Sequence, residues 1–155
     1  VSQGANKEVF FYLKLIGFKV VFISIAVMAG SIIGGIVSGF ILKLPLYISA
    51  TSAAGMSFYS ITGAYMTQQY GIEIGTYGFI VNVMREFITV LTMPLLIKIS
   101  LGAPIAAGAA GDMDTMLAPI TKFVGIRLSL VTLLTGTLLT FVVPFLLPII
   151  SAIFQ

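Results

Sequence analysis

The sequence predicts an all-α integral membrane protein with about five transmembrane segments, one of which is an interrupted helix. Three observations support this prediction. The 155-residue chain is 59% hydrophobic and only 8% charged, whereas ordinary soluble domains are about 25% charged. Its long apolar runs are separated by short polar breaks. Finally, residues 108–119 place two carboxylates in a stretch that is otherwise apolar and crowded with Gly and Ala.

Composition excludes several classes of protein and site. The formal net charge of +3 comes from scattered Lys and Arg residues, which argues against a nucleic-acid partner. The chain has no cysteine and no histidine, so disulfides, thiolate chemistry and the usual base and metal ligand are absent. We therefore expect one membrane domain over residues 1–155, surrounded by lipid, with no cofactor and no metal site. Residues 1–9 are polar and form an expected aqueous lead-in.

The first segment, residues 17–42, is long enough to cross a hydrocarbon core of roughly 30 Å with some tilt. Small residues recur along it in two neighbouring rows: Ala26, Gly30, Gly34 and Ser38, and beside them Ser31, Gly35 and Gly39. Such rows let helices approach closely. Two interpretations stay open, namely an interface to another subunit through Gly30, Gly34 and Ser38, or packing against the next helix of the same chain.

The second segment, residues 46–68, follows Pro45, which starts a helix well and disfavours continuation of the preceding one. It is the most polar segment, and its hydroxyl groups are densest over residues 57–62. We predict that Ser57, Tyr59 and Ser60 line a cavity. The alternative is that these hydroxyls bond back to their own helix.

The third segment, residues 75–100, carries Asn82, Arg85 and Glu86 near its middle. Their spacing of three and four residues places them close together on one side of a helix. Ionisable groups inside a membrane are costly and by default mark a site. The alternative is a buried ion pair between Arg85 and Glu86 that only fixes helix packing.

Residues 108–119 form the expected interrupted helix, and they contain Gly111, Asp112, Asp114 and Thr115. Gly together with the flanking prolines makes a continuous helix costly here. Non-helical backbone at membrane depth is tolerated only where protein or a water-filled cavity covers it. A wet loop outside the membrane is the alternative. A final apolar segment covers residues 126–154, and its threonines are expected to pack.

The distribution of basic residues predicts the orientation. With five crossings, one side of the membrane carries Lys7, Lys14, Lys19, Lys122 and Arg127, and the other carries Lys43 and Lys98. Cytoplasmic loops carry an excess of Lys and Arg. This count predicts a cytoplasmic N-terminus and a multi-pass protein of the inner (plasma) membrane.

Three motifs in order resemble the lysine exporter family also called LysO: Ser57-Phe-Tyr-Ser-Ile-Thr-Gly63, Asn82-Val-Met-Arg-Glu86, and the stretch 108–119. The resemblance covers nearly all of the chain from the first segment onward and corresponds to the C-terminal half of the family pattern. It implies one inverted repeat of the cation/proton antiporter and bile-acid-symporter architecture. Two departures stand out, since Phe58 replaces a Trp and Gly111-Asp112 replaces a Thr-Ser pair.

The resemblance implies a transporter half that exports a basic amino acid such as lysine, coupled to a proton or cation. Its motifs place the coupling or substrate-facing carboxylate at Asp114. The expected substrate- and ion-binding residues are Asp114, Asp112, Gly111, Thr115, Asn82, Arg85, Glu86, Tyr59, Ser57 and Ser60. The expected partner is a separate N-terminal-half protein or further copies of the chain.

Two other functions remain as alternatives to transport. One is a non-transporting membrane subunit that assembles through the glycine-rich first segment. The other is an intramembrane aspartyl protease, which needs two carboxylates on different helices. Ala109 stands where the usual Gly-x-Gly-Asp motif has its first Gly, and no Tyr-Asp partner occurs elsewhere. We therefore do not expect an enzyme.

Overall fold

The computed structural model describes residues 2–155, and this part of the chain is helical throughout, without strands. In chain order the elements are α1 (Ser2–Leu42), α2 (Leu46–Ala54), α3 (Tyr59–Tyr70), α4 (Ile72–Ile99), α5 (Ala103–Gly108), the 3₁₀ helix η1 (Ala109–Met113), α6 (Leu117–Val124) and α7 (Ile126–Phe154). The expected all-α class is confirmed. Residues 2–9 of the expected lead-in continue α1, whereas Val1 lies outside the described residues.

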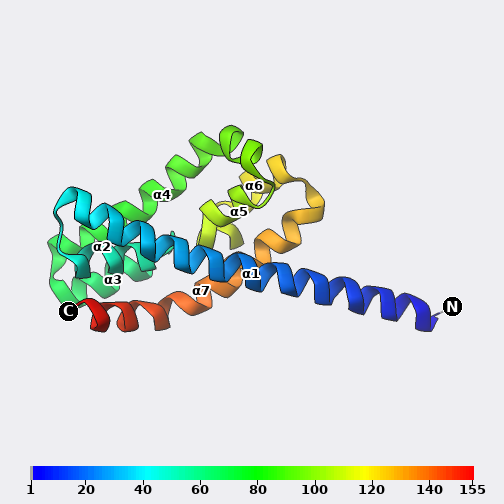
Figure 1. Cartoon of the computed structure of the whole chain (residues 1–155), viewed down its shortest axis with the longest axis horizontal. Coiled ribbons are helices and arrows are strands. Elements are labelled where there is room, and N and C mark those ends of the chain that lie inside the picture. The colour runs from blue at the N-terminus through cyan, green and yellow to red at the C-terminus, as the bar shows by residue number, and fades with distance from the viewer. Residues whose placement is uncertain (1) are drawn as a thin grey trace.

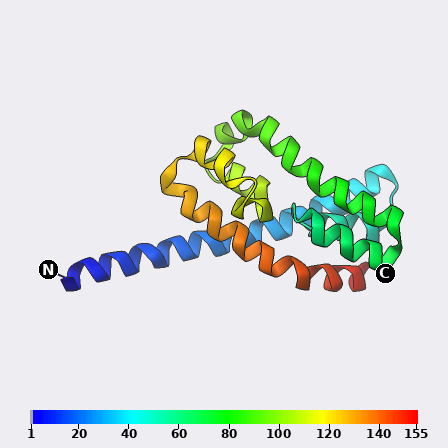
Figure 2. The same ribbon diagram turned by 180° about the vertical axis from the view of Figure 1, so that it is seen from behind.

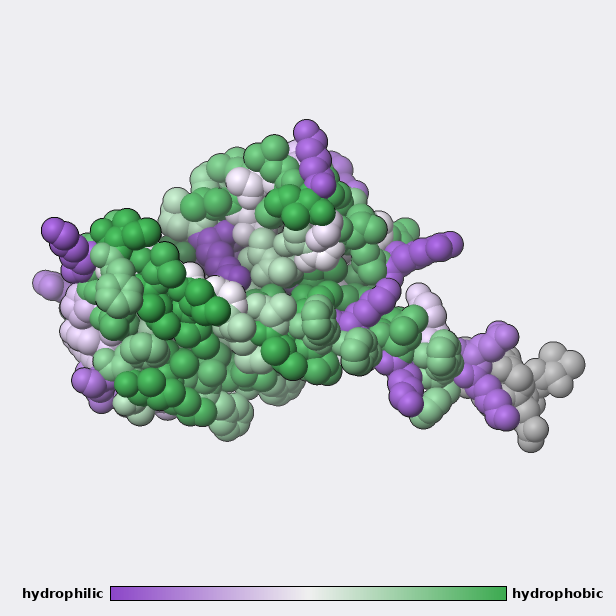
Figure 3. Space-filling view, viewed as in Figure 1, coloured by the Kyte–Doolittle hydropathy of each residue, from purple (hydrophilic) through white to green (hydrophobic). Residues whose placement is uncertain are grey.

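Within the described residues, three helices are long and apolar enough to cross a membrane: Phe10–Leu42 of α1, α4 and α7. In both views α1 and α7 run in the same direction and α4 runs the opposite way, so that the two termini lie at opposite ends (Figures 1 and 2). On the face that Figure 3 shows, the surface between these ends is largely hydrophobic. A hydrophobic surface of this kind suits contact with lipid. Long helices suit it as well, because each helix satisfies its own backbone hydrogen bonds.

Helices α2 and α3 form a first hairpin that returns to the end where α1 finishes. The rings of Tyr47, at the start of α2, and Tyr70, at the end of α3, lie 4.9 Å apart between centroids. Ser52 also donates to the sulfur of Met66 across the hairpin. With 9 and 12 residues, the arms are roughly 14 and 18 Å long, too short to cross alone. The sequence predicted one continuous segment over residues 46–68 instead.

Helices α5 and α6, with η1 between them, form a second hairpin from the opposite end, where α4 finishes and α7 begins (Figures 1 and 2). Ile105 of α5 and Ile120 and Val124 of α6 share one buried apolar cluster. These arms have 6 and 8 residues, which is roughly 9 and 12 Å. The chain of the expected interrupted segment therefore turns back on itself, and three helices, rather than five segments, are each long and apolar enough to cross a membrane in the described residues.

The tips of the two hairpins meet in the interior. The backbone N–H of Ala110 donates to the carbonyl oxygen of Met56 at 2.9 Å. Both residues belong to a buried apolar cluster that also contains Leu139 and Val143 of α7. The core of the molecule therefore lies where the tips contact α7.

Helix α1 packs on the first hairpin through one of its two rows of small residues. A Cβ atom added to Gly35 would lie 2.4 Å from the Cβ of Ala53, and one added to Gly39 would lie 2.2 Å from the Oγ of Ser49. The neighbouring row differs, because nothing lies within 4 Å of a Cβ added to Gly30 or Gly34. The intramolecular packing considered for this helix is made by Gly35 and Gly39, while Gly30 and Gly34 are exposed and line an open hollow that Arg85 of α4 and Ala106 of α5 also line.

Candidate functional site

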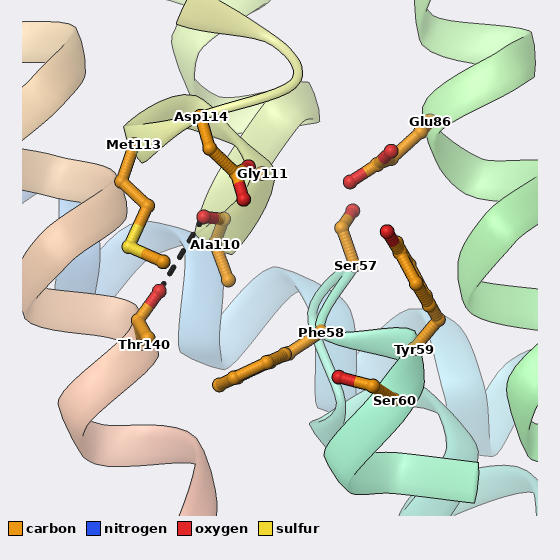
Figure 4. A pocket seen from close by; sticks show the side chains of 10 residues that line it. All are labelled: Ser57, Phe58, Tyr59, Ser60, Glu86, Ala110, Gly111, Met113, Asp114 and Thr140. Carbon is orange, nitrogen blue, oxygen red and sulfur yellow. Dashed lines mark hydrogen bonds between the residues drawn. The ribbon is translucent and has the colours of Figure 1, made fainter.

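A small, partly open cavity lies at the meeting point of the two hairpin tips. It is lined by Ser57, Phe58, Tyr59, Ser60, Glu86, Ala110, Gly111, Met113, Asp114 and Thr140 (Figure 4). The lining comes from the first hairpin, α4, the second hairpin and α7. The cavity is therefore formed by elements that come from opposite ends of the molecule.

Two carboxylates, Glu86 of α4 and Asp114 of the second hairpin, line this cavity (Figure 4). The hydroxyl of Thr115 donates to the carboxylate of Glu86, at 3.1 Å from either oxygen. The backbone N–H of Thr115 donates to Asp114 Oδ1 at 2.5 Å. Thr115 thus couples the two acids and fixes the direction in which each one points.

Ser57 at the tip of the first hairpin is held by Asn82 of α4. Asn82 accepts the backbone N–H of Ser57 at 2.8 Å and donates at 2.9 Å to the carbonyl oxygens of Ser52 and Gly78. Gly55 makes room for this amide, since a Cβ there would lie 2.8 Å from Asn82 Nδ2. The Ser57 hydroxyl is buried without a protein partner and points toward Glu86 (Figure 4).

Arg85 lies outside the cavity, on the side of α4 that faces α1 and α5. Its guanidinium donates to Ser31 Oγ at 2.7 Å and to the carbonyl oxygens of Ala107 at 3.2 Å and Ala106 at 3.4 Å. These carbonyls belong to the last turn of α5 and have no partner within their own helix. Arg85 therefore caps α5, whereas Glu86 bonds to Thr115. The two side chains are held by different partners and do not form the mutual ion pair that was the alternative to a site role.

Asp112 is fully buried and also lies outside the cavity. Neither of its carboxylate oxygens has a hydrogen-bond partner in the protein. Its side chain lies against Gly108 and Gly136, where an added Cβ would clash with Asp112 atoms at 1.9 and 2.8 Å. Asp112 and Asp114 thus point to different surroundings, and the structure does not bring the two carboxylates together.

Six of the ten predicted site residues line the cavity: Ser57, Tyr59, Ser60, Glu86, Gly111 and Asp114. Gly111 lies close to the Glu86 carboxylate, since a Cβ there would lie 2.4 Å from Glu86 Oε1 and would displace that side chain. Asn82 and Thr115 do not line the cavity but hydrogen-bond to the lining residues Ser57 and Glu86. Arg85 and Asp112 lie outside the cavity. Sequence reasoning missed Thr140, whose hydroxyl donates to Ala110 at 3.4 Å, because threonines in an apolar helix usually bond to their own backbone.

Chemically, the cavity offers two carboxylates and several hydroxyl groups inside an apolar fold. Such a set can accept a cation or a proton, because carboxylates form the strongest hydrogen bonds with charged donors. Among the residues that the structure describes, no group of three or more His, Cys, Asp or Glu is placed to hold a metal ion.

Comparison with known proteins gives one consistent result. Residues 1–151 match the family described as "Lysine exporter LysO". The chain is 30% identical over 130 residues to the "Lysine exporter LysO" of Escherichia coli (strain K12), covering 84% of the chain and 44% of that protein. It is 26% identical over 122 residues to a "Putative lysine exporter" of Haemophilus influenzae, covering 79% of the chain and 63% of that protein. The chain thus spans about half the length of these curated relatives, and no solved structure matches it.

Proposed function

The chain belongs to the lysine exporter LysO family, and from this we propose that it is a transporter half that exports a basic amino acid such as lysine. The observation that carries the proposal is the position of Glu86 and Asp114, which line one cavity at the tips of two opposed hairpins. A carboxylate inside an apolar fold is expensive unless it serves a pathway or a site.

The cavity is the binding site in this proposal. The carboxylates of Glu86 and Asp114 receive the ammonium group of the substrate, and Ser57 and Tyr59 contribute hydroxyl oxygens. The unpartnered hydroxyl of Ser57 supports this role, because a buried polar group without a partner costs free energy that a ligand can recover.

Export is coupled to a proton or a cation at the same acids. Asp114 is exposed to the cavity and alternates between binding substrate and binding the coupling ion, so that one occupant displaces the other. Broken segments near the membrane midplane, with rigid-body movement around them, are typical of secondary transporters. The two hairpins enter from opposite ends, so movement of one tip opens the cavity to one side only.

The hairpins change the expected orientation count. Lys7, Lys14 and Lys19 of α1, Lys98 at the end of α4, and Lys122 and Arg127 around the α6–α7 turn belong to the end where α1 begins. Lys43 lies at the other end. Six against one is a stronger bias than the five against two of a five-crossing arrangement. By the positive-inside rule, the end where α1 begins is cytoplasmic, in a multi-pass protein of the inner membrane.

The chain works with a partner, either a separate protein that corresponds to the rest of its relatives or further copies of itself. The outward-facing row of Gly30, Gly34 and Ser38 is the proposed packing interface. Open space beside Gly30 and Gly34 supports it, because small residues allow close contact between membrane helices. The same row favours the alternative of a non-transporting subunit. Relatives named as exporters give no support to the protease alternative.

The test compares the two neighbouring aspartates in proteoliposomes that contain the protein and any partner it needs. Asp114→Asn keeps the size of the side chain and removes its titratable charge, and we expect it to abolish lysine-driven proton or cation movement in a folded protein. Asp112→Asn, the matched control outside the cavity, should retain much of the flux. Flux that survives Asp114→Asn and vanishes in Asp112→Asn would move the site away from the cavity.

A further inference from the structure

A second hollow lies between α6 and α7, at the end of the molecule that carries most of the basic residues. It contains about 1060 Å³ of space, open to the surroundings. Its walls are apolar, formed by Leu117 of α6 and by Leu130 and Leu133 of α7. We refer to this hollow as the α6–α7 groove.

The groove carries opposite charges at its two ends. Asp114, just before α6, lines the inner end, and Lys122, in the last turn of α6, lines the outer end. Eight residues of mostly helical chain place their backbones roughly 12 Å apart along the groove. Near Lys122 the groove also has the hydroxyl of Thr121, which is buried without a protein partner.

Asp114 lines both this groove and the cavity at the hairpin tips. The inner end of the groove is therefore also the edge of the candidate binding site. A molecule that moved along the groove from its outer end would meet the carboxylate of Asp114 first and would then reach Glu86.

We propose that the α6–α7 groove is the cytoplasmic vestibule for a zwitterionic basic amino acid, with Lys122 binding its α-carboxylate and Asp114 its side-chain ammonium. This inference rests on the proposed function and adds Lys122 to the residues that bind the substrate. The apolar walls suit the methylene chain that joins the two charged groups.

The charge pattern favours an amino acid over the acyl chain of a phospholipid as the occupant. An anionic headgroup could pair with Lys122, and the leucines could contact its acyl chain. That chain would then cover the carboxylate of Asp114 with hydrocarbon, and an unpaired carboxylate in such surroundings is costly. A ligand with a cation at its inner end removes this cost.

The experiment compares three ligands with and without the cation at the mouth of the groove. L-lysine carries both charged groups, cadaverine lacks the carboxylate, and L-norleucine lacks the ammonium. Their binding is measured by calorimetry on the purified protein with any partner it needs, for the wild type, for Lys122→Met and for the control Arg127→Met. Arg127 is a nearby cation at the start of α7 that does not line the groove.

We expect Lys122→Met to weaken lysine binding about 10-fold to 100-fold, the loss of one charged hydrogen bond, and to leave cadaverine unchanged. Arg127→Met should leave both unchanged, and norleucine should bind no variant. Equal affinities of wild type and Lys122→Met for lysine, or equal losses for lysine and cadaverine, would overturn the vestibule but leave the cavity standing. A phospholipid that co-purifies with the wild type and is lost in Lys122→Met would also overturn it. No lysine binding to the wild type would overturn the proposed function itself.

Discussion

The backbone N–H of Ala110 donates to the carbonyl oxygen of Met56 at 2.9 Å, and this bond joins the tips of the two hairpins. The backbone on both sides of it is left-handed: φ is 46° at Met56, 74° at Ser57 and 53° at Ala109. Non-glycine residues rarely adopt this region, and strain of this kind gathers at functional sites. The strained backbone of both tips thus lies at their contact, where one backbone hydrogen bond and a shared apolar cluster hold them together.

The first prediction concerns the strain at Ser57. Ser57→Gly removes a left-handed side chain, worth about 1–2 kcal/mol, and an unpartnered buried hydroxyl, worth about 1–3 kcal/mol. It adds unfolded-state entropy worth about 0.5–1 kcal/mol. The variant should therefore be more stable to heat in detergent while its lysine transport falls. Ser60→Gly, in the regular helix α3, is the control and should lose stability. A Ser57→Gly protein that is less stable than the wild type would show that the tip is not strained.

A second prediction concerns Arg85. Its three bonds to Ser31, Ala106 and Ala107 use the spread geometry of a guanidinium, which an ammonium cannot reproduce. Arg85→Lys should therefore destabilise the protein by about 1–3 kcal/mol, measured as thermal unfolding in detergent. Arg127→Lys, on an exposed cation, should change stability by less than about 0.5 kcal/mol. Equal stability of the two variants would mean that the capping of α5 contributes nothing.

The long helices could be predicted from the sequence because hydropathy is a local property that sums along the chain. The hairpins could not, since residues 46–68 are long enough to cross a membrane as one helix. The left-handed backbone at Met56 and Ser57 interrupts the helix in this segment. Neither residue type favours that conformation. The break is thus imposed by tertiary contacts, among them the bond between Asn82 and the backbone of Ser57.

The cavity was partly predictable for a related reason. Glu86 and Asp114 stand out as acids in apolar surroundings, and they lie together in the structure. The different surroundings of Asp112 and Asp114 depend on the 3₁₀ helix η1, which contains Asp112 and ends just before Asp114, and sequence patterns do not specify such a helix. Thr140 and Lys122 gain their positions only when α7 packs against the second hairpin, so no local signal marks them.

A third prediction separates the two rows of small residues on α1. Gly35→Leu should prevent folding or strongly reduce expression, because even a Cβ at this position would lie 2.4 Å from Ala53. Gly30→Leu should fold, since nothing lies within 4 Å, but it should weaken association with a partner or a second copy. Size-exclusion chromatography with light scattering distinguishes the two results. Unchanged assembly of the Gly30→Leu variant would leave the outward-facing row without a role.

The last prediction separates hairpins from crossings. The chain has no cysteine, so single cysteines can be placed without background. If both short-helix pairs are hairpins, α4 runs from the outside to the cytoplasm, so Gln69→Cys is labelled by an impermeant thiol reagent in intact cells and Lys98→Cys only after lysis. Five crossings would reverse both results, because the loop before α4 would then be cytoplasmic. Lys43→Cys, which is external in either arrangement, serves as the control for labelling from outside. The two arrangements thus place the loop before α4 and the end of α4 on opposite sides of the membrane, and labelling of Lys98→Cys in intact cells would show that α2 and α3 together cross it.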